Sequence, residues 1–190
     1  PMPEGAREGL LRGIYRFRKS EVRDTELHAQ LFGSGTILNE TLKAQEFLGE
    51  KYGVAADVWS VTSYKELYRD GLEAERWNML HPLEIKRKPY ITECVGNTPG
   101  VFVAASDYVM ALPDSISQWL PKPLVSLGTD GFGRSAGRKE LRDFFEVDWR
   151  YITLAVLASL TWEEKIEPDV VMSAINELDI NPGKVSPLIS

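Results

Sequence analysis

A short apolar run that passes directly into a glycine-rich turn constrains this fold more than any other stretch of the chain. Residues 123–127 read Pro-Leu-Val-Ser-Leu, and Gly128, Gly131 and Gly133 follow before a helical pattern opens at Ser135. Glycine is required where the backbone turns with φ > 0 or approaches another segment closely. The pattern therefore predicts a central strand buried on both faces, a tight turn at its carboxyl end and the start of a helix.

This turn has a functional and a structural interpretation, because open α/β sheets usually bind ligands at the carboxyl ends of their strands. In the functional one, Asp130 and Asp107, each at a predicted strand end, approach one another. In the structural one, each aspartate caps a helix or bonds to a turn. The residues favour the structural interpretation, in which four residues form a structural turn: Gly128, Asp130, Gly131 and Gly133.

Strands that alternate with helices predict a three-layer α/β/α domain with a mixed sheet of about five strands. Apolar runs at 29–32, 56–62, 101–105 and 123–127 predict four buried strands. The segment from Tyr15 to Phe17 alternates apolar and charged residues, as an exposed edge strand does. We expect it to be antiparallel, because no crossover helix separates it from the next strand.

The helix after residues 56–62 carries the clearest local signals. Ser63 and Glu66 have the Ser-x-x-Glu spacing of a capping box, in which the two side chains satisfy each other's backbone N–H groups. Leu67 and Leu72 are expected to pack beneath this helix. Further helices are expected at 4–13, 37–52, 90–95, 106–120 with an interruption at Pro113, after Ser135, at 149–165 with Asp148 as its cap, and from Pro168.

Composition excludes several classes of protein. The 190 residues suffice for one large domain, and a net charge of -6 argues against a nucleic-acid partner. The single cysteine, Cys94, excludes an internal disulfide and fits a reducing compartment. Because no apolar run approaches the ~20 residues of a membrane span and no signal segment is seen, we expect a cytoplasmic protein. The start at Pro1-Met2-Pro3, without a leading methionine, suggests a fragment.

Few residues could carry chemistry. The histidines His28 and His81 and the lone Cys94 are too few and too scattered for a closed zinc site. A Cys94–His81 nucleophile pair is one alternative, but a lone buried cysteine is usually inert packing. Residues 33–36, Gly-Ser-Gly-Thr, lack the third glycine of the dinucleotide fingerprint and the Gly-Lys-Ser/Thr of a P-loop. Lys86-Arg87-Lys88 is typical of a solvated face. No catalytic, cofactor-binding or metal-binding residue is assigned.

Residues 76–82 read Arg-Trp-Asn-Met-Leu-His-Pro and concentrate side chains that need partners. The string is placed after a helix rather than in the expected core, and Arg and Trp are enriched in interface hot spots. It contributes four candidate interface residues: Arg76, Trp77, Asn78 and His81. The alternative is that Trp77 and Met79 cap the sheet edge, while Asn78 and His81 satisfy backbone groups of a loop.

Together, four strings resemble one family: Leu-Phe-Gly-Ser-Gly-Thr at 31–36, Asp-Val-Trp-Ser-Val-Thr-Ser at 57–63, Arg-Trp-Asn-Met-Leu-His-Pro at 76–82 and Leu-Gly-Thr-Asp-Gly-Phe-Gly-Arg-Ser at 127–135. From about Glu4 to Ser190 the chain is similar to the C-terminal third of the homodimeric bacterial pyruvate dehydrogenase first component. More loosely, it resembles transketolase C-terminal domains. The resemblance implies that residues 1–190 form a single transketolase C-terminal-like domain of a longer enzyme.

For the whole enzyme, the resemblance implies thiamine diphosphate and Mg²⁺, oxidative decarboxylation of pyruvate, and acetylation of a lipoyl group on the dihydrolipoyl acetyltransferase core. The family holds these cofactors between N-terminal and middle domains that this chain lacks. We therefore expect the fragment to be inactive, to bind neither cofactor, and to meet the remaining domains of its chain and a second subunit of a homodimer. The alternative is an autonomous regulatory module that binds a small anion at the turns at 33–36 and 128–135.

Overall fold

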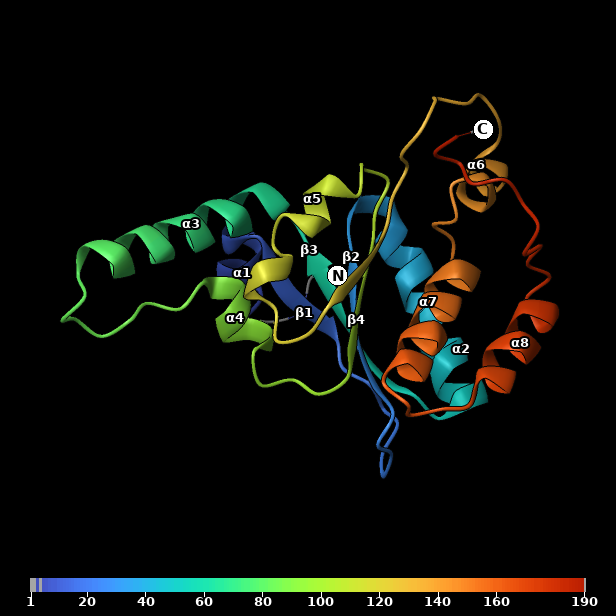
Figure 1. Cartoon of the computed structure of the whole chain (residues 1–190), viewed down its shortest axis with the longest axis horizontal. Coiled ribbons are helices and arrows are strands. Elements are labelled where there is room, and N and C mark those ends of the chain that lie inside the picture. The colour runs from blue at the N-terminus through green and yellow to red at the C-terminus, as the bar shows by residue number, and fades with distance from the viewer. Residues whose placement is uncertain (1–2, 4, 190) are drawn as a thin grey trace.

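A five-stranded mixed sheet forms the centre of the structure, a computed structural model that describes residue 3 and residues 5–189 (Figure 1). The strand order is β1-β3-β2-β4-β5. Four strands are parallel: β2 (His28–Gly33), β3 (Ala55–Val61), β4 (Val101–Ala105) and β5 (Leu124–Leu127). The first strand, β1 (Ile14–Arg18), pairs antiparallel with β3. The predicted α/β fold, with a mixed sheet of about five strands and one antiparallel edge strand, is confirmed.

Two expectations about strand neighbours are wrong. β1 pairs with β3 and not with the next strand in the sequence, because β2 is enclosed between β3 and β4. β5 is an edge strand rather than the central one, and all four of its residues are only half-buried. Leu124 packs toward one face of the sheet and Val125 toward the other, so both faces of β5 contact a core. Its residues are only half-buried because an edge strand has a neighbouring strand on one side only.

Helices cover both faces of the sheet, which gives the expected three layers. One face packs against α2 (Leu38–Tyr52), α7 (Trp149–Trp162) and α8 (Pro168–Glu177). The other packs against α3 (Tyr64–Leu80), α4 (Tyr90–Val95) and the 3₁₀ turn η2 (Ser117–Trp119). Two short helices lie beside the edge strands: α1 (Arg7–Arg12) contacts β1, and α5 (Ala111–Asp114) contacts β5. Successive strand residues point to opposite faces, so Leu31 enters the first core and Phe32 the second.

The ends of several helices differ from the expected positions. Glu4 lies outside the described residues, and α1 begins at Arg7. α5 begins at Ala111 rather than at Ser106, and its Pro113 is buried within the helix. The helix after the glycine turn, α6 (Arg138–Phe144), begins three positions later than expected. The Asp148 cap of α7 is confirmed, because its carboxylate accepts a hydrogen bond from Arg150 N at 2.9 Å.

The capping box at the start of α3 is only half formed. Ser63 Oγ accepts a hydrogen bond from Glu66 N at 3.2 Å, as predicted. The Glu66 carboxylate instead pairs with Arg69 at 3.0 Å, and Ser63 N donates to Gly13 O. Leu67 is fully buried, but Leu72 is 41% exposed, which contradicts its predicted position. Five residues turn an α-helix by well over one full turn, so the two leucines lie on different faces.

α3 extends beyond the sheet that supports it. Its buried residues end at Ala74, and residues 81–88, which return toward α4, are all exposed. Figure 1 shows α3 and this returning loop as a projection on one side of the molecule. Among the described residues, no helix has the length and apolar character that a membrane crossing requires.

Candidate functional site

The carboxyl ends of the parallel strands bring the two glycine turns of the sequence together. The turn after β2 supplies Thr36 and Ile37, the turn after β4 supplies Asp107, and the turn after β5 supplies Thr129 and Gly131. Together with α6, they line an open groove of about 650 Å³. This groove lies at the sheet edge where ligands of α/β proteins usually bind.

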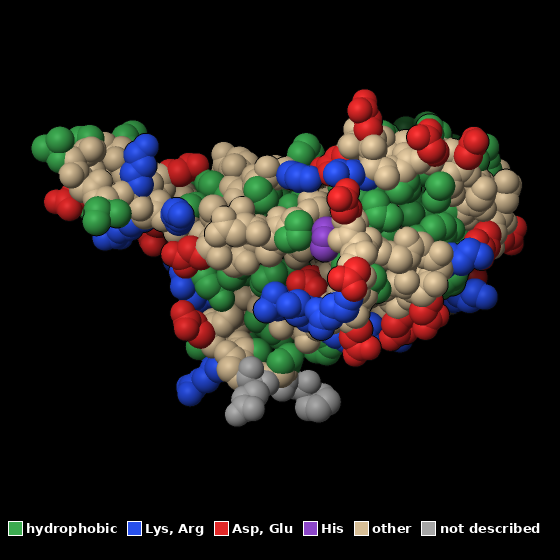
Figure 2. Space-filling view, turned by 90° about the horizontal axis from the view of Figure 1, so that it is seen from below, with side chains coloured by type: hydrophobic (Ala, Val, Ile, Leu, Met, Phe, Trp, Pro, Cys, Tyr) green, Lys and Arg blue, Asp and Glu red, His purple; other side chains and the backbone are tan. Residues whose placement is uncertain are grey.

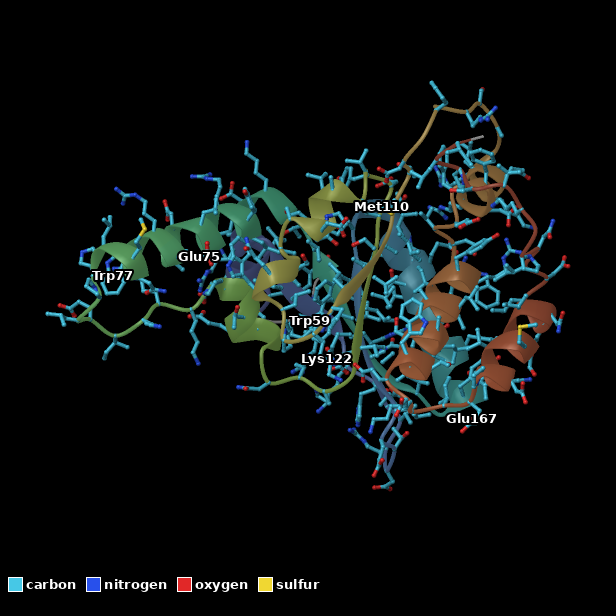
Figure 3. All side chains as sticks on the ribbon, in the orientation of Figure 1. Trp59, Glu75, Trp77, Met110, Lys122 and Glu167 are labelled. Atoms are coloured by element: carbon cyan, nitrogen blue, oxygen red, sulfur yellow. The ribbon has the colours of Figure 1, made fainter. Side chains whose placement is uncertain are left out.

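Polar contacts join the turn after β5 to the turn after β4. Thr129 N donates to Tyr108 O at 2.9 Å, and Thr129 Oγ1 donates to Asp107 O at 3.0 Å. The Asp130 carboxylate accepts a hydrogen bond from Met110 N at 2.7 Å. Met110 directly precedes α5, and Figure 3 labels it there. Asp130 therefore bonds to a turn, which is one form of the structural interpretation, and its carboxylate holds the turn after β5 to the turn after β4.

The glycines of this turn have different roles. Gly131 has a φ of 103°, and a Cβ there would overlap Pro187 O of the C-terminal segment. A Cβ at Gly128 would lie 2.6 Å from Tyr108 O. At Gly133 φ is not positive, and a Cβ would meet no atom within 4 Å. The turn thus requires glycine at two of the three positions, while Gly133 lies in open space.

Three arginines border the groove, and one of them is neutralised by a buried carboxylate. Arg142 pairs with Glu40 at 2.9 Å and donates to Thr36 Oγ1 at 3.1 Å. Glu40 is buried, also pairs with Lys43 at 3.1 Å, and accepts a hydrogen bond from Trp149 N. The pair therefore connects α2 to α6 and α7. The exposed Arg134 lies 5.0 Å over the Phe144 ring.

The groove offers charge and apolar contact rather than a catalytic set. Among the described residues that line it there is no histidine, cysteine or lysine, and its apolar wall consists of Ile37, Leu141, Phe145 and Val147. Across residues 3 and 5–189, no three His, Cys, Asp or Glu side chains gather closely enough to hold a metal ion. Such a surface suits contact with another polypeptide segment better than acid–base or nucleophilic chemistry.

The residues considered for nucleophilic chemistry have separate surroundings. Cys94 lies on α4 beside Tyr90, and burial raises the pKa of its thiol, which opposes formation of the thiolate. His81 ends α3, where its ring stacks on Trp77. His28 begins β2, opposite Ala55 of β3. Each side chain therefore has its own structural setting, and no Cys94–His81 contact is formed.

Three of the candidate interface residues, Arg76, Trp77 and Asn78, lie in the last turns of α3 rather than after it. His81 directly follows the last helical residue, Leu80. Trp77 lies between two partners: its ring centroid is 4.4 Å from that of His81, and the Arg87 guanidinium lies 4.1 Å from it on the returning loop. Asn78 donates to Arg87 O at 2.9 Å and accepts from Arg87 N at 2.8 Å. Arg76 and His81 are exposed, whereas Trp77 and Asn78 are half-buried.

The alternative interpretation of this string is half right. Asn78 and His81 do satisfy backbone groups, because His81 Nδ1 also bonds to Trp77 O at 2.8 Å. Trp77 and Met79 do not cap the sheet edge: Figure 3 places Trp77 near the far end of α3, well away from Trp59 on the sheet. The reason is that α3 continues past Ala74, its last buried residue.

Sequence reasoning missed two features of these sites. The first is Glu40, whose position between Ile37 and Ala44 at helical spacing could have marked it as buried. The second is a set of large apolar side chains around the end of α3 that are exposed to solvent: Met79, Leu80, Leu83 and Ile85. Apolar residues between Pro82 and Pro89, without a helical or strand period, were the available signal.

Comparisons with known proteins place this fold and sequence among a defined set of enzymes. The model of the transketolase-like TK C-terminal domain family matches residues 13–148. The Pseudomonas aeruginosa pyruvate dehydrogenase E1 component is 47% identical over 188 residues, which are 98% of this chain. The Escherichia coli K12 pyruvate dehydrogenase E1 component is 44% identical over 190 residues. The chain spans 21% of the length of each of these relatives.

Several solved transketolases have the same fold. The Leishmania mexicana transketolase superposes with a TM-score of 0.53 at 18% identity, covering 83% of this chain and 19% of that one. A Pichia stipitis transketolase superposes with a TM-score of 0.57 at 13% identity, covering 86% of this chain and 20% of that one. At this identity the likeness concerns the fold alone.

Proposed function

This chain belongs to the transketolase-like TK C-terminal domain family, and we propose that it serves as the C-terminal domain of a pyruvate dehydrogenase E1 component. The observation that carries the proposal is the 47% identity to such a component over 98% of this chain. The matched segment includes residues of both sheet faces and both glycine turns. The whole enzyme would decarboxylate pyruvate oxidatively and acetylate the lipoyl group of a dihydrolipoyl acetyltransferase core.

The proposal includes thiamine diphosphate and Mg²⁺ as cofactors of the whole enzyme but not as ligands of these residues. The groove at the sheet edge has Asp107 as its one carboxylate among the described lining residues, with arginines around it. The three arginines give this lining a net positive charge that repels Mg²⁺, so it does not fit the metal of a diphosphate cofactor. In this proposal the chemical steps take place on other parts of the longer enzyme.

The role proposed for the domain is architectural. Its sheet, covered on both faces, forms a stable body, while the groove and the end of α3 present surfaces to the rest of a longer polypeptide. In this proposal the enzyme is a homodimer that acts in the cytoplasm. The other interpretation, an autonomous module that binds a small anion, receives no support from the relatives, and Glu40 already neutralises one groove arginine.

Pyruvate-dependent ferricyanide reduction, with thiamine diphosphate and Mg²⁺ present, tests this proposal. The longer polypeptide should turn over pyruvate, whereas the 190-residue chain and a longer polypeptide that lacks these residues should not. The decisive comparison adds the purified 190-residue chain back to the truncated enzyme. Turnover by the 190-residue chain alone, or full activity without it, would contradict the proposed role.

A further inference from the structure

The end of α3 and the loop that returns from it expose large apolar side chains to solvent. Leu83 and Ile85 are 99% and 90% exposed, and Met79 and Leu80 are 73% and 52% exposed. We call residues 76–89 the arm tip. Figure 2 shows apolar side chains gathered at the end of the projecting part of the molecule, away from its main body. Exposed apolar groups concentrated on one projection mark an interaction site.

The arm tip has a defined shape that does not depend on burying these side chains. The paired hydrogen bonds between Asn78 and the Arg87 backbone join the helix to the returning loop. Trp77 is held between His81 and Arg87. All of these contacts lie within the tip itself. A surface that is ordered before it meets its partner loses little conformational entropy on binding.

The arm tip also differs in charge from the rest of the chain. It has four cationic side chains, Arg76, Lys86, Arg87 and Lys88, and one carboxylate, Glu84, so it carries +3 in a chain of net charge -6. Among the described residues, no carboxylate lies within 4.0 Å of the cationic groups of Arg76, Lys86 or Lys88. An apolar centre beside unpaired charges is the pattern of a docking surface with a charged rim.

We propose that the arm tip docks into an apolar cup with a carboxylate rim, supplied by a part of the longer polypeptide outside these 190 residues. The charge of the tip selects an acidic partner, and its apolar side chains select a concave apolar one. The relatives place about four fifths of their length outside the matched segment, so their chains have room for such a cup. This inference rests on the proposed function, because it needs the longer chain.

Site-resolved thiol labelling measures this docking without any use of catalysis. Leu83→Cys is introduced into the longer polypeptide and into the 190-residue chain, with Cys94→Ser in both, and maleimide labelling is followed by peptide mass spectrometry. A docked thiol reacts only through its undocked fraction, so L83C should label at least about tenfold more slowly in the longer polypeptide. Ile85→Cys repeats the measurement at a second exposed position.

The control lies on the same helix. Lys65 is exposed at the start of α3, far from the arm tip, so K65C should label at similar rates in both proteins. Equal labelling of L83C and I85C in the two proteins would overturn the proposal. If L83C is protected only after the acetyltransferase core is added, the cup belongs to that protein and not to the longer polypeptide. If protection appears as the concentration of the 190-residue chain rises, the partner is a second copy of the chain. Either result would overturn the proposed partner.

Charge reversal tests the carboxylate rim. In the longer polypeptide, Lys86→Glu with Lys88→Glu should return L83C labelling to the rate of the 190-residue chain. The control reverses two exposed lysines outside the arm tip, Lys139→Glu with Lys165→Glu. This pair should leave the protection of L83C in place. Protection that survives reversal at the tip would exclude an acidic rim. Pyruvate turnover, measured in parallel, reports separately on the proposed function, so either idea can fail while the other stands.

Discussion

The six-membered ring of Trp119 lies directly against the Cα of Gly71, so close that a Cβ at this position would overlap ring carbons. The indole Nε1 of Trp119 also donates to Glu75 Oε1 at 2.7 Å, one turn further along α3. This contact holds α3 to the 3₁₀ turn η2 just before the helix leaves the body of the molecule. The part of α3 from which the arm tip projects is therefore held in place by a contact that requires glycine at position 71.

Gly71→Ala should destabilise the protein. Alanine favours a helix over glycine by about 1 kcal/mol, but overpacking a close contact costs about 1–3 kcal/mol, and a ring locked by a hydrogen bond cannot easily move. We expect a lower urea midpoint with an unchanged m-value. Leu72→Ala, at the exposed neighbouring position, should change the stability by less than about 0.5 kcal/mol. A gain in stability for G71A would show that the indole relaxes freely.

Gly131→Ala and Gly133→Ala should differ in their effects. At Gly131 the positive φ and the backbone of Pro187 both oppose a side chain, so the alanine variant should lose about 1 kcal/mol or more. At Gly133 a methyl group meets open space, so its variant should be nearly neutral or slightly stabilising. Thermal or urea unfolding of the two variants measures this difference. Equal losses would mean that the two positions play the same role.

Alanine at Trp77 or at His81 should leave the stability of the 190-residue chain almost unchanged. Both side chains lie beyond Ala74, and their contacts are confined to the arm tip, so each loss should be about 1 kcal/mol or less. Trp59→Ala, in the core, should cost about 3–5 kcal/mol. In the longer polypeptide, the Trp77 and His81 variants should weaken dimerisation or activity. Unfolding of the isolated chain by either of them would place the string in the core.

Alkaline unfolding should depend on Tyr151. Burial, followed by the nearby Glu146 and Asp143 carboxylates, raises the pKa of Tyr151 from its ordinary value of 10.0 to about 12. A folded-state pKa above the unfolded one means that this contribution is complete below pH 10 and is lost as the pH rises toward 12. Tyr151→Phe should therefore flatten the fall of stability in this range. Urea unfolding measured between pH 10 and pH 12 tests this prediction. If the stability of Y151F falls with pH as steeply as that of the unchanged protein, Tyr151 is not responsible for the fall.

Local patterns predicted most of the elements because each reports a local physical requirement. The β-rich runs became β2, β3 and β4, and Asp148 caps α7 because its carboxylate reaches the N–H groups of the next turn. The structural role of Asp130 was also among the predicted alternatives. The candidate site was harder: the groove combines turns from three strands and an Arg142–Glu40 pair separated by 102 positions in the sequence.

The sequence by itself determined which segments are strands and helices, and which side chains need burial or a partner. Only the tertiary structure decided that β5 is an edge strand, that β1 lies beside β3, and that α3 continues beyond its last buried residue, Ala74. Periodicity specifies the face of an element that is buried, but not the neighbour that buries it. Neighbours follow from the order of strands and from the reach of each crossover, which depend on contacts between residues far apart in the chain.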